Sequence, residues 1–248
     1  MDIRCCFYAP PARELSNDIV VLIDVLRATS NIVTMLDKGA KKVFLFEDED
    51  EPKSQKLYYP NAVLAGERDC EKIRGFDMGN SPSESLNFKI KGREVFLTTT
   101  NGTKAAIAAS VSDHAYVGSI LNITAVCELV GKLAKQTAKN ITLLCAGWKG
   151  NAAIDDIYTA GAIINKSIVT GSIRNFEIDD SARIAKLVHG GFPRPMDALL
   201  ASISGKMLSE RGLTSDIAFC AKPDLYKIVP KIVKEDGFII AKTDKQEE

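Results

Sequence analysis

Several features that would place this chain in a familiar functional class are missing. Its 248 residues carry 32 Lys and Arg against 32 Asp and Glu, so the formal net charge is zero and no basic stripe favours nucleic-acid binding. No run of about 18 apolar residues predicts a membrane span. The N-terminal stretch lacks the basic, apolar and small-residue order of a signal peptide. We therefore expect a cytoplasmic protein that binds neither nucleic acid nor a membrane.

Residues typical of metal clusters and disulfide frameworks are also scarce. Only two histidines occur, His114 and His189, and they are too few and too far apart for a zinc site. No Cys-x-x-Cys pair occurs, and a chain of this length needs no covalent staples, so reduced core thiols are expected. The six cysteines are Cys5, Cys6, Cys70, Cys127, Cys145 and Cys220.

Three phosphate-related signatures are incomplete or missing. The strand-like run that ends at Asp24 begins like a haloacid-dehalogenase motif, but Leu26 stands where that motif has a second Asp. Cys145 begins like a cysteine-phosphatase loop, but Asn151 stands where the arginine belongs. No Gly-x-x-x-x-Gly-Lys-Ser/Thr loop occurs either, so a nucleotide P-loop is not supported.

The patterns that are present predict a layered α/β/α fold. Hydrophobic residues make up 46% of the chain, and apolar runs such as 18–24 and 140–145 alternate with helical segments. Continuous apolar strands of this kind are typical of a mixed, largely parallel sheet covered on both faces. We expect one domain over 1–248, with a possible smaller subregion over 168–248. Within that subregion we expect helices at 179–189 and 196–211 and strands at 216–220 and 237–242.

A hydroxyl-rich loop joins a predicted strand over 94–98 to a predicted helix that ends near Ala109. Its residues are Thr99, Thr100, Asn101, Gly102 and Thr103. A loop that opens a helix offers free N–H groups and the positive end of the helix dipole, which together favour an anion. An ordinary helix cap followed by a turn residue explains the same pattern, so both interpretations stay open.

Charged residues stand at the ends of several predicted strands. In a largely parallel sheet these ends meet at one edge, where ligands bind. Carboxylates and arginines there suit Mg²⁺ and a phosphate group. Surface ion pairs and helix N-terminal charges are the simpler alternatives, and Cys145 is most simply a core residue. The charged residues concerned are Asp24, Arg27, Glu67, Arg68, Asp155 and Asp156, and Gly147 follows the end of the predicted strand over 140–145.

Taken together and in order, these motifs resemble those of the 2-phosphosulfolactate phosphatase (ComB) family over nearly the whole chain. In this family a Glu-Asp pair follows the glycine loop, whereas this chain has Asp155-Asp156. The segments that carry the resemblance are Ile-Asp-Val-Leu-Arg-Ala-Thr-Ser at 23–30, Ala-Gly-Glu-Arg at 65–68, Gly-Phe-Asp-Met-Gly-Asn-Ser-Pro at 75–82, Thr-Thr-Asn-Gly-Thr at 99–103, Cys-Ala-Gly at 145–147, and 212–229 with Asp216, Cys220 and Asp224.

The resemblance implies a Mg²⁺-dependent phosphatase that hydrolyses 2-phosphosulfolactate to 3-sulfolactate and phosphate in coenzyme M biosynthesis. The expected catalytic residues are Asp24, Arg27 and Cys145, and the nucleophile is metal-bound water, Asp24 or Cys145. The expected metal ligands are some of Asp24, Glu67, Asp155 and Asp156. The expected substrate-binding residues are Arg68, Asn80, Ser81, Thr99, Thr100, Asn101, Gly102, Thr103 and Gly147.

Two alternatives to this activity stay open. The same chemistry could act on other 2-phospho-hydroxy acids, or the chain could be a non-catalytic binder of phosphorylated acids. In each case the expected partner is a small anionic phosphate ester. A homodimer is plausible, although the sequence shows no readable interface.

Overall fold

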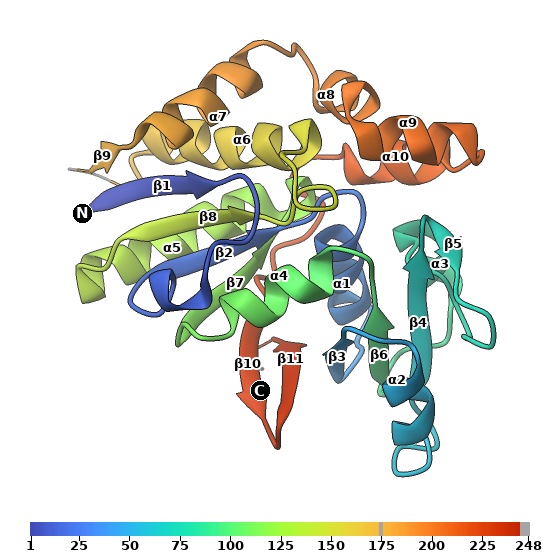
Figure 1. Ribbon diagram of the computed structural model, residues 1–248. Helices are drawn as coiled ribbons and strands as arrows, with labels where there is room; N and C mark the ends of the chain where they lie inside the picture. Colours follow the sequence, from blue (N-terminus) through green and yellow to red (C-terminus); the bar gives the residue numbers. More distant parts are fainter. Residues whose placement is uncertain (174–175, 244–248) are drawn as a thin grey trace.

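The computed structural model describes residues 1–173 and 176–243, and within them a single sheet joins all the strands (Figure 1). The strands are β1 (Asp2–Cys6), β2 (Ile19–Ile23), β3 (Lys42–Phe46), β4 (Val63–Arg68), β5 (Glu71–Lys72), β6 (Glu94–Thr98), β7 (His114–Gly118), β8 (Ile141–Cys145), β9 (Glu177–Ile178), β10 (Lys231–Glu235) and β11 (Phe238–Lys242). Their order in the sheet is β5-β4-β6-β3-β11-β10-β7-β2-β8-β1-β9.

The helices fill the connections between these strands. They are η1 (Ala12–Glu14), α1 (Ala28–Asp37), α2 (Asp50–Gln55), α3 (Pro82–Asn87), α4 (Gly102–Ala109), η2 (Ile120–Asn122), α5 (Ile123–Thr137), α6 (Ile154–Thr170), α7 (Asp180–Gly190), α8 (Pro195–Ala201), α9 (Ile203–Glu210) and α10 (Thr214–Cys220).

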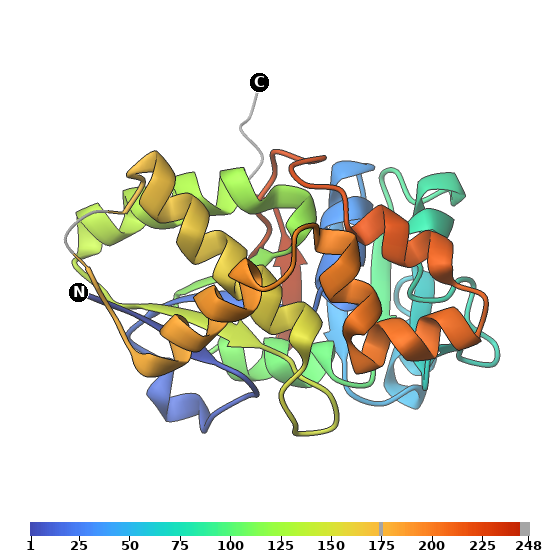
Figure 2. The same ribbon diagram turned by 90° about the horizontal axis from the view of Figure 1, so that it is seen from above.

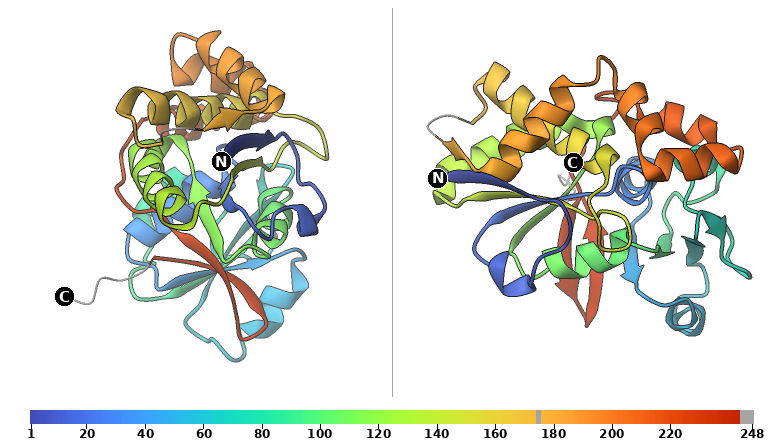
Figure 3. Two further views of the ribbon diagram at one scale, coloured as in Figure 1. Left: turned by 90° about the vertical axis from the view of Figure 1, so that its left-hand side faces the viewer. Right: turned by 45° about the horizontal axis from the view of Figure 1, so that its top comes forward.

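The sheet is mixed and largely parallel, as the sequence predicts. Strands β7, β2, β8 and β1 are parallel neighbours, and so are β3, β6 and β4. The antiparallel hairpin β10–β11 lies between these two groups and pairs with β7 on one side and β3 on the other. The left view of Figure 3 shows the hairpin in red, extending from the middle of the molecule into its lower part. The last strands of the chain therefore join the two parallel groups into one sheet.

Strand β2 shows why both faces of the sheet are covered. Ile19, Val21 and Ile23 lie in a core cluster with α5, α6 and α7, whereas Val20 and Leu22 lie in a second cluster with α1 and α4. Because successive side chains of a strand point to opposite faces, a strand that is apolar at every position needs a helical layer on each side. The predicted layered α/β/α fold is confirmed.

The C-terminal helices differ in part from the prediction. The predicted helix over 196–211 is interrupted at Ser202, whose extended backbone ends α8 and whose hydroxyl caps α9 at Gly205 N (2.9 Å). The predicted strand over 216–220 is wrong, because this segment forms α10. Asp216, Ile217 and Cys220 are buried at helical spacing, and a run of mostly apolar residues satisfies the strand period as well as the helix period.

Helices α8, α9 and α10 extend from the end of α7 toward α1 and α3, as seen from above in Figure 2. They bring the last third of the chain beside the carboxyl ends of the parallel strands. No helix within 1–173 and 176–243 is long and apolar enough to cross a membrane. The division into one domain with a smaller C-terminal subregion stays a prediction.

Candidate active site

A polar cavity lies at the carboxyl ends of β2, β4, β6 and β8. Most of the residues that the sequence analysis selected line this one cavity, although they come from distant parts of the chain. Parallel strands make this possible, because the loops that follow them leave the sheet at the same edge. The selected residues in its wall are Asp24, Arg27, Glu67, Asn80, Thr99, Thr100, Asn101, Gly147, Asp155 and Asp156.

Asp24 follows the last residue of β2 and begins the turn into α1. Its Oδ1 accepts a hydrogen bond from the N–H of Ala28 (3.2 Å), and its own N–H donates to Thr29 Oγ1 (3.1 Å). Burial raises the pKa of Asp24 to about 7; the Ala28 bond lowers it in part, and the nearby carboxylates of Asp155 and Glu67 raise it further. Asp24 can therefore exchange a proton near neutral pH.

Asp155 and Asp156 open α6 in two different environments. Asp156 accepts hydrogen bonds from the N–H groups of Val25 (2.9 Å) and Gly147 (3.0 Å), one on each oxygen. Asp155 is only 1% exposed, yet its Oδ1 has no hydrogen-bond partner in the described chain. Burial raises the pKa of Asp155 to about 6, and burial with the adjacent carboxylates of Asp155 and Asp24 raises the pKa of Asp156 well above its usual value.

Glu67 ties together two loops at the mouth of the cavity. Its oxygens accept from the N–H groups of Cys70 and Thr100, each at 2.8 Å. The next residue, Arg68, donates instead to the backbone oxygen of Glu47 (2.6 Å) and is not part of the cavity wall. The structure therefore does not bring the predicted substrate-binding Arg68 to the site, because its half-buried side chain is bonded to the β3–α2 loop.

The hydroxyl-rich loop between β6 and α4 lies directly against Asp24. A Cβ atom added to Gly102 would stand 2.6 Å from Asp24 Oδ2 and 2.5 Å from the Cβ of Ala28, so only glycine permits this approach. Thr99 Oγ1 accepts from the N–H of Thr103 (3.1 Å), and the Thr103 hydroxyl donates back to Thr99 O (3.0 Å). Thr99 thus caps the first turn of α4, and Thr103 supports the loop from behind the cavity wall.

Thr100 and Asn101 stand at the open side of the same loop. The buried Thr100 Oγ1 has no hydrogen-bond partner among the described residues. Asn101 does not cap α4 with its side chain, and its Oδ1 accepts instead from the N–H of Lys149 (3.1 Å). The ordinary-cap interpretation therefore fits Thr99, whereas the Thr100 hydroxyl stays free to meet an anion.

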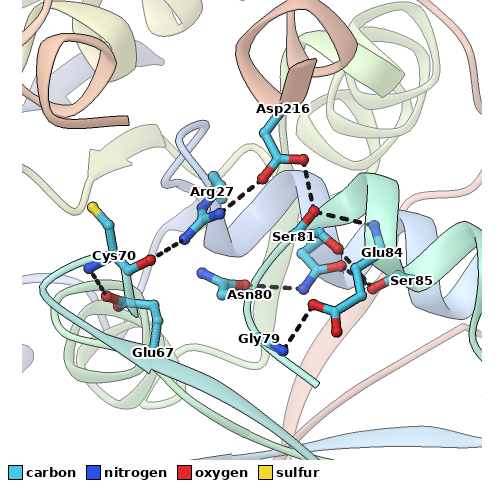
Figure 4. Close-up of polar contacts among 10 residues, drawn as sticks. Arg27, Glu67, Cys70, Gly79, Asn80, Ser81, Glu84, Ser85 and Asp216 are labelled. Atoms are coloured by element: carbon cyan, nitrogen blue, oxygen red, sulfur yellow. Dashed lines mark hydrogen bonds and ion pairs between the residues drawn. The ribbon is translucent and has the colours of Figure 1, made fainter. Parts of the chain in front are cut away.

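Arg27 enters the cavity wall as a buried charge. It is 5% exposed, and its Nη1 pairs with Asp216 Oδ2 at 2.8 Å (Figure 4). The other Asp216 oxygen accepts from Ser81 Oγ (2.7 Å), which also caps α3. Asn80 accepts from the side chain of Asn31 (3.0 Å) and faces the cavity, whereas Ser81 lies behind Arg27.

Cys145, a predicted candidate nucleophile, is not at the cavity. It is the last residue of β8, and its thiol lies in the core under α5 and α6, 3.9 Å from the thiol of Cys5. Its neighbour Cys5 and burial raise the pKa of Cys145 well above its usual value. A buried thiol that does not line the cavity fits the interpretation of Cys145 as a core residue, and its assignment as a catalytic residue stays a prediction that this geometry does not support.

Four further residues that the sequence analysis did not select line the cavity: Leu26, Cys70, Trp148 and Ser204. The first three follow the ends of β2, β4 and β8, so the strand-end rule could have found them. Ser204 comes from α9, and its hydroxyl, with that of Ser202, lowers the pKa of Asp155 in opposition to burial. No sequence signal places α9 beside α6, so this contribution could not be predicted.

The fit of a divalent cation depends on which carboxylate oxygens are free. Among the described residues, no group of three or more His, Cys, Asp or Glu side chains is arranged to hold a metal ion. Glu67 and Asp156 use both oxygens on backbone N–H groups, whereas Asp155 keeps an unpartnered oxygen and Asp24 bonds through Oδ1 alone. One or two carboxylates, completed by water and phosphate oxygens, are usual for Mg²⁺. Asp24 and Asp155 therefore fit Mg²⁺, but a four-carboxylate cage is not assembled.

By its fold the chain is a layered α/β protein with a ligand cavity at the carboxyl ends of its parallel strands. A family model described as 2-phosphosulpholactate phosphatase matches residues 8–235. The chain belongs to this family, and it is therefore an enzyme of the phosphoric monoester hydrolase class.

Several curated relatives carry the name probable 2-phosphosulfolactate phosphatase. The protein of Caldanaerobacter subterraneus subsp. tengcongensis is 38% identical over 223 residues, which is 89% of this chain and 90% of the relative. That of Pseudothermotoga lettingae is 40% identical and covers 89% of this chain and 92% of the relative. That of Deinococcus radiodurans is 37% identical and covers 88% and 89%.

Proposed function

We propose that this chain hydrolyses the phosphate ester of a small 2-hydroxy acid with the help of Mg²⁺, and that 2-phosphosulfolactate is its substrate. The observation that carries the proposal is the meeting of Asp24, Asp155 and Arg27 with the Thr99–Asn101 loop in one cavity. The names of the curated relatives supply the substrate. In this proposal the pathway is coenzyme M biosynthesis.

The residues have distinct roles in this proposal. The phosphate lies on the loop before α4, where backbone N–H groups and the Thr100 hydroxyl meet its oxygens. Arg27 lies across it and balances charge on the phosphoryl group. Asp24, with a pKa of about 7, has two alternative roles. It takes the proton of a water that attacks phosphorus and displaces the hydroxy acid, or it attacks phosphorus itself, the hydroxy acid leaves, and water then hydrolyses the aspartyl phosphate to release phosphate.

Asp24 and Asp155 would hold the cation, which when bound neutralises the phosphoryl oxygens. The rate acceleration that phosphate-ester hydrolysis requires supports this role. Phosphate-monoester hydrolysis is among the slowest reactions in water, and enzymes accelerate it by up to ~10²¹-fold. A single hydrogen-bond donor contributes about 10²–10³-fold, so the hydroxyl loop and one arginine alone would fall far short.

The test of this function is phosphate release from a panel of esters, measured at saturating Mg²⁺. The panel holds 2-phosphosulfolactate, 2-phospholactate, phosphoglycolate and p-nitrophenyl phosphate. The highest kcat/KM for 2-phosphosulfolactate supports the full proposal. Equal values for all the 2-phospho acids would keep the chemistry and overturn the substrate. No release from any ester, despite binding, would favour the non-catalytic binder.

A further inference from the structure

We infer that Asp216 of α10 is a positioning residue that holds Arg27 against the phosphate, so that the C-terminal helices set the geometry of a site formed mainly by the strand ends. This inference rests on the proposed function, because it assigns Arg27 to the phosphoryl group. Asp216 does not line the cavity and therefore acts only through its partners.

The contacts of Asp216 divide between two segments that meet at the site. One oxygen binds Arg27 Nη1 at 2.8 Å, and the other accepts from Ser81 Oγ at 2.7 Å (Figure 4). Ser81 is fixed in turn because it caps α3 through Glu84 N (3.1 Å). The side chain of Asp216 is only 1% exposed, so water does not replace these two partners of the carboxylate. Asp216 on α10 thus holds Nη1 of the guanidinium, and Ser81 at the start of α3 holds Asp216 in turn.

A second contact of Arg27 connects its guanidinium to Glu67 through the backbone of Cys70. Its Nη2 donates to the backbone oxygen of Cys70 at 3.4 Å, and the N–H of Cys70 donates to Glu67. Glu67 accepts from Thr100 N with its other oxygen. A continuous chain of hydrogen bonds therefore runs from α10 through Arg27 to the loop where the phosphate would lie.

Asp216 has a close chemical counterpart at the opposite end of the strands, which serves as a matched control. Asp18 also pairs an arginine, Arg4 Nη2 at 2.9 Å, and accepts a hydroxyl, Thr142 Oγ1 at 2.5 Å. It stands just before β2, whereas Asp24 stands just after it, so about 20 Å of strand separates the two. Asp18 thus reproduces the bonding pattern of Asp216 at a more exposed ion pair and without access to the site.

The test compares Asp216→Asn and Asp18→Asn in the full-length chain. An amide keeps one acceptor for the arginine but removes the charge that orients it. For Asp216→Asn we expect kcat/KM to fall by about 10–100-fold, the usual effect of losing the partner of a site residue. For Asp18→Asn we expect kcat/KM to stay unchanged and Tm to fall no further than in Asp216→Asn, because the Arg4–Asp18 pair is more exposed. Equal kcat/KM in Asp216→Asn and wild type would overturn the inference.

A double-mutant cycle with Arg27→Lys separates positioning from general loosening of the fold. If Asp216 acts through Arg27, Asp216→Asn has little further effect on kcat/KM once Arg27 is Lys. If Asp216→Asn lowers kcat/KM by the same factor whether residue 27 is Arg or Lys, the inference is overturned. Asp216→Glu, which keeps the charge but displaces it by one methylene, gives the same comparison if Asp216→Asn does not fold.

Binding of inorganic phosphate, measured by calorimetry, distinguishes failure of this inference from failure of the proposed function. If wild type binds phosphate but hydrolyses no ester, the function fails; a Kd weakened about tenfold or more in Asp216→Asn but not in Asp18→Asn would still support positioning. If wild type hydrolyses esters and Asp216→Asn neither loses activity nor weakens the Kd, positioning fails and the function stands. If wild type neither binds phosphate nor hydrolyses any ester, both fail.

Discussion

Two adjacent aspartates at the start of α6 have opposite relations to their surroundings. Both oxygens of Asp156 accept backbone hydrogen bonds, from Val25 and Gly147, which hold two loops of the site in place. Asp155 is equally buried but leaves Oδ1 without a partner. A buried carboxylate oxygen without a partner destabilises the fold unless a ligand satisfies it. In the proposed function Asp155 is therefore the acid with an oxygen free for the ligand, whereas the bonds of Asp156 hold the loops of the site.

We predict that Asp155→Asn and Asp156→Asn fail in different ways. Asp155→Asn removes repulsion from a buried cluster, so Tm should hold or rise while kcat falls by about 10² or more. Asp156→Asn places an NH₂ group against a backbone donor, so the free energy of unfolding should fall by about 1–3 kcal/mol. Thermal unfolding and phosphate release on both variants check this prediction.

The opposite pattern would contradict these roles. If Asp155→Asn kept full activity at saturating Mg²⁺, its assignment as a ligand would be wrong. If Asp156→Asn kept the stability of wild type, its two backbone bonds would not hold the loops.

The sequence predicted which residues lie at the ends of the strands, but it did not predict the direction of their side chains. Asp24, Glu67 and Gly147 follow parallel strands, and the strand-end rule brought them together correctly. Arg68 and Cys145 stand at the same ends, but the side chain of Arg68 binds the Glu47 loop and Cys145 faces the core. The sequence places a residue at the edge of a sheet but does not reveal which way its side chain turns there.

At the scale of elements, the β10–β11 hairpin joins the two parallel halves of the sheet through charge as well as backbone pairing. Glu235 on β10 pairs with Lys42 on β3 and with Lys242 on β11 (2.7 Å). Hydrogen bonds from Lys242 and Lys42 lower the pKa of Glu235 from 4.5 to about 2. The carboxylate therefore stabilises the folded chain only in its charged form.

We predict that Glu235→Gln weakens the fold in a pH-dependent way. A folded pKa below the unfolded one gives stability that is fully present above about pH 4.5 and lost as the pH falls through about 2. The variant should therefore unfold at lower urea concentration than wild type at pH 7. Because the pair is partly exposed, the difference should stay below about 1 kcal/mol and shrink in high salt.

Urea titrations at pH 7 and near pH 2 measure this difference. A gap between wild type and Glu235→Gln that stayed constant down to pH 2 would contradict the charge pairing. Glu94 on β6 pairs with Lys41 at 3.6 Å, a longer distance than the 2.7 Å of the Glu235–Lys242 pair, and Glu94→Gln serves as the control. We expect a smaller change for that variant.

Strongly patterned elements were predictable and ambiguous ones were not. The buried strands β2, β6 and β8 and the helix α6 follow from apolar runs and helical spacing. Segment 216–220 was predicted as a strand because nearly all its residues are apolar, and tertiary contacts of α10 decide the outcome. Strand β10 was missed because its lysines and glutamate dilute the alternating pattern.

At the scale of the whole molecule, the buried acids Asp24 and Asp155 make the stability of the fold depend on pH and on cations. The pKa of Asp24 is about 7 and that of Asp155 is about 6, both above the usual 3.8, chiefly because of burial. Between about pH 4 and 7 the folded chain thus binds protons that the unfolded chain has released. By linkage, the free energy of unfolding falls as the pH rises through this range.

We predict that, in EDTA, the free energy of unfolding of the wild-type protein falls as the pH rises from about 4 to 7. We expect a smaller pH dependence for Asp155→Asn, because this variant has one titrating acid fewer in the site. Mg²⁺ should raise Tm more at pH 7.5 than at pH 5, because the cation competes with protons for the same oxygens. Thermal unfolding across pH with EDTA or Mg²⁺ checks both expectations. Identical slopes in wild type and Asp155→Asn would contradict the shifted pKa of Asp155.

The most direct test of the central claim is the rate of phosphate release from 2-phosphosulfolactate by the metal-stripped protein, with and without added Mg²⁺. We predict negligible release in EDTA and full recovery when Mg²⁺ is restored, because without a cation Asp24 and Asp155 would repel each other and the phosphate. An equal rate in EDTA, or no release in either condition, would contradict a metal-assisted phosphatase at the strand ends.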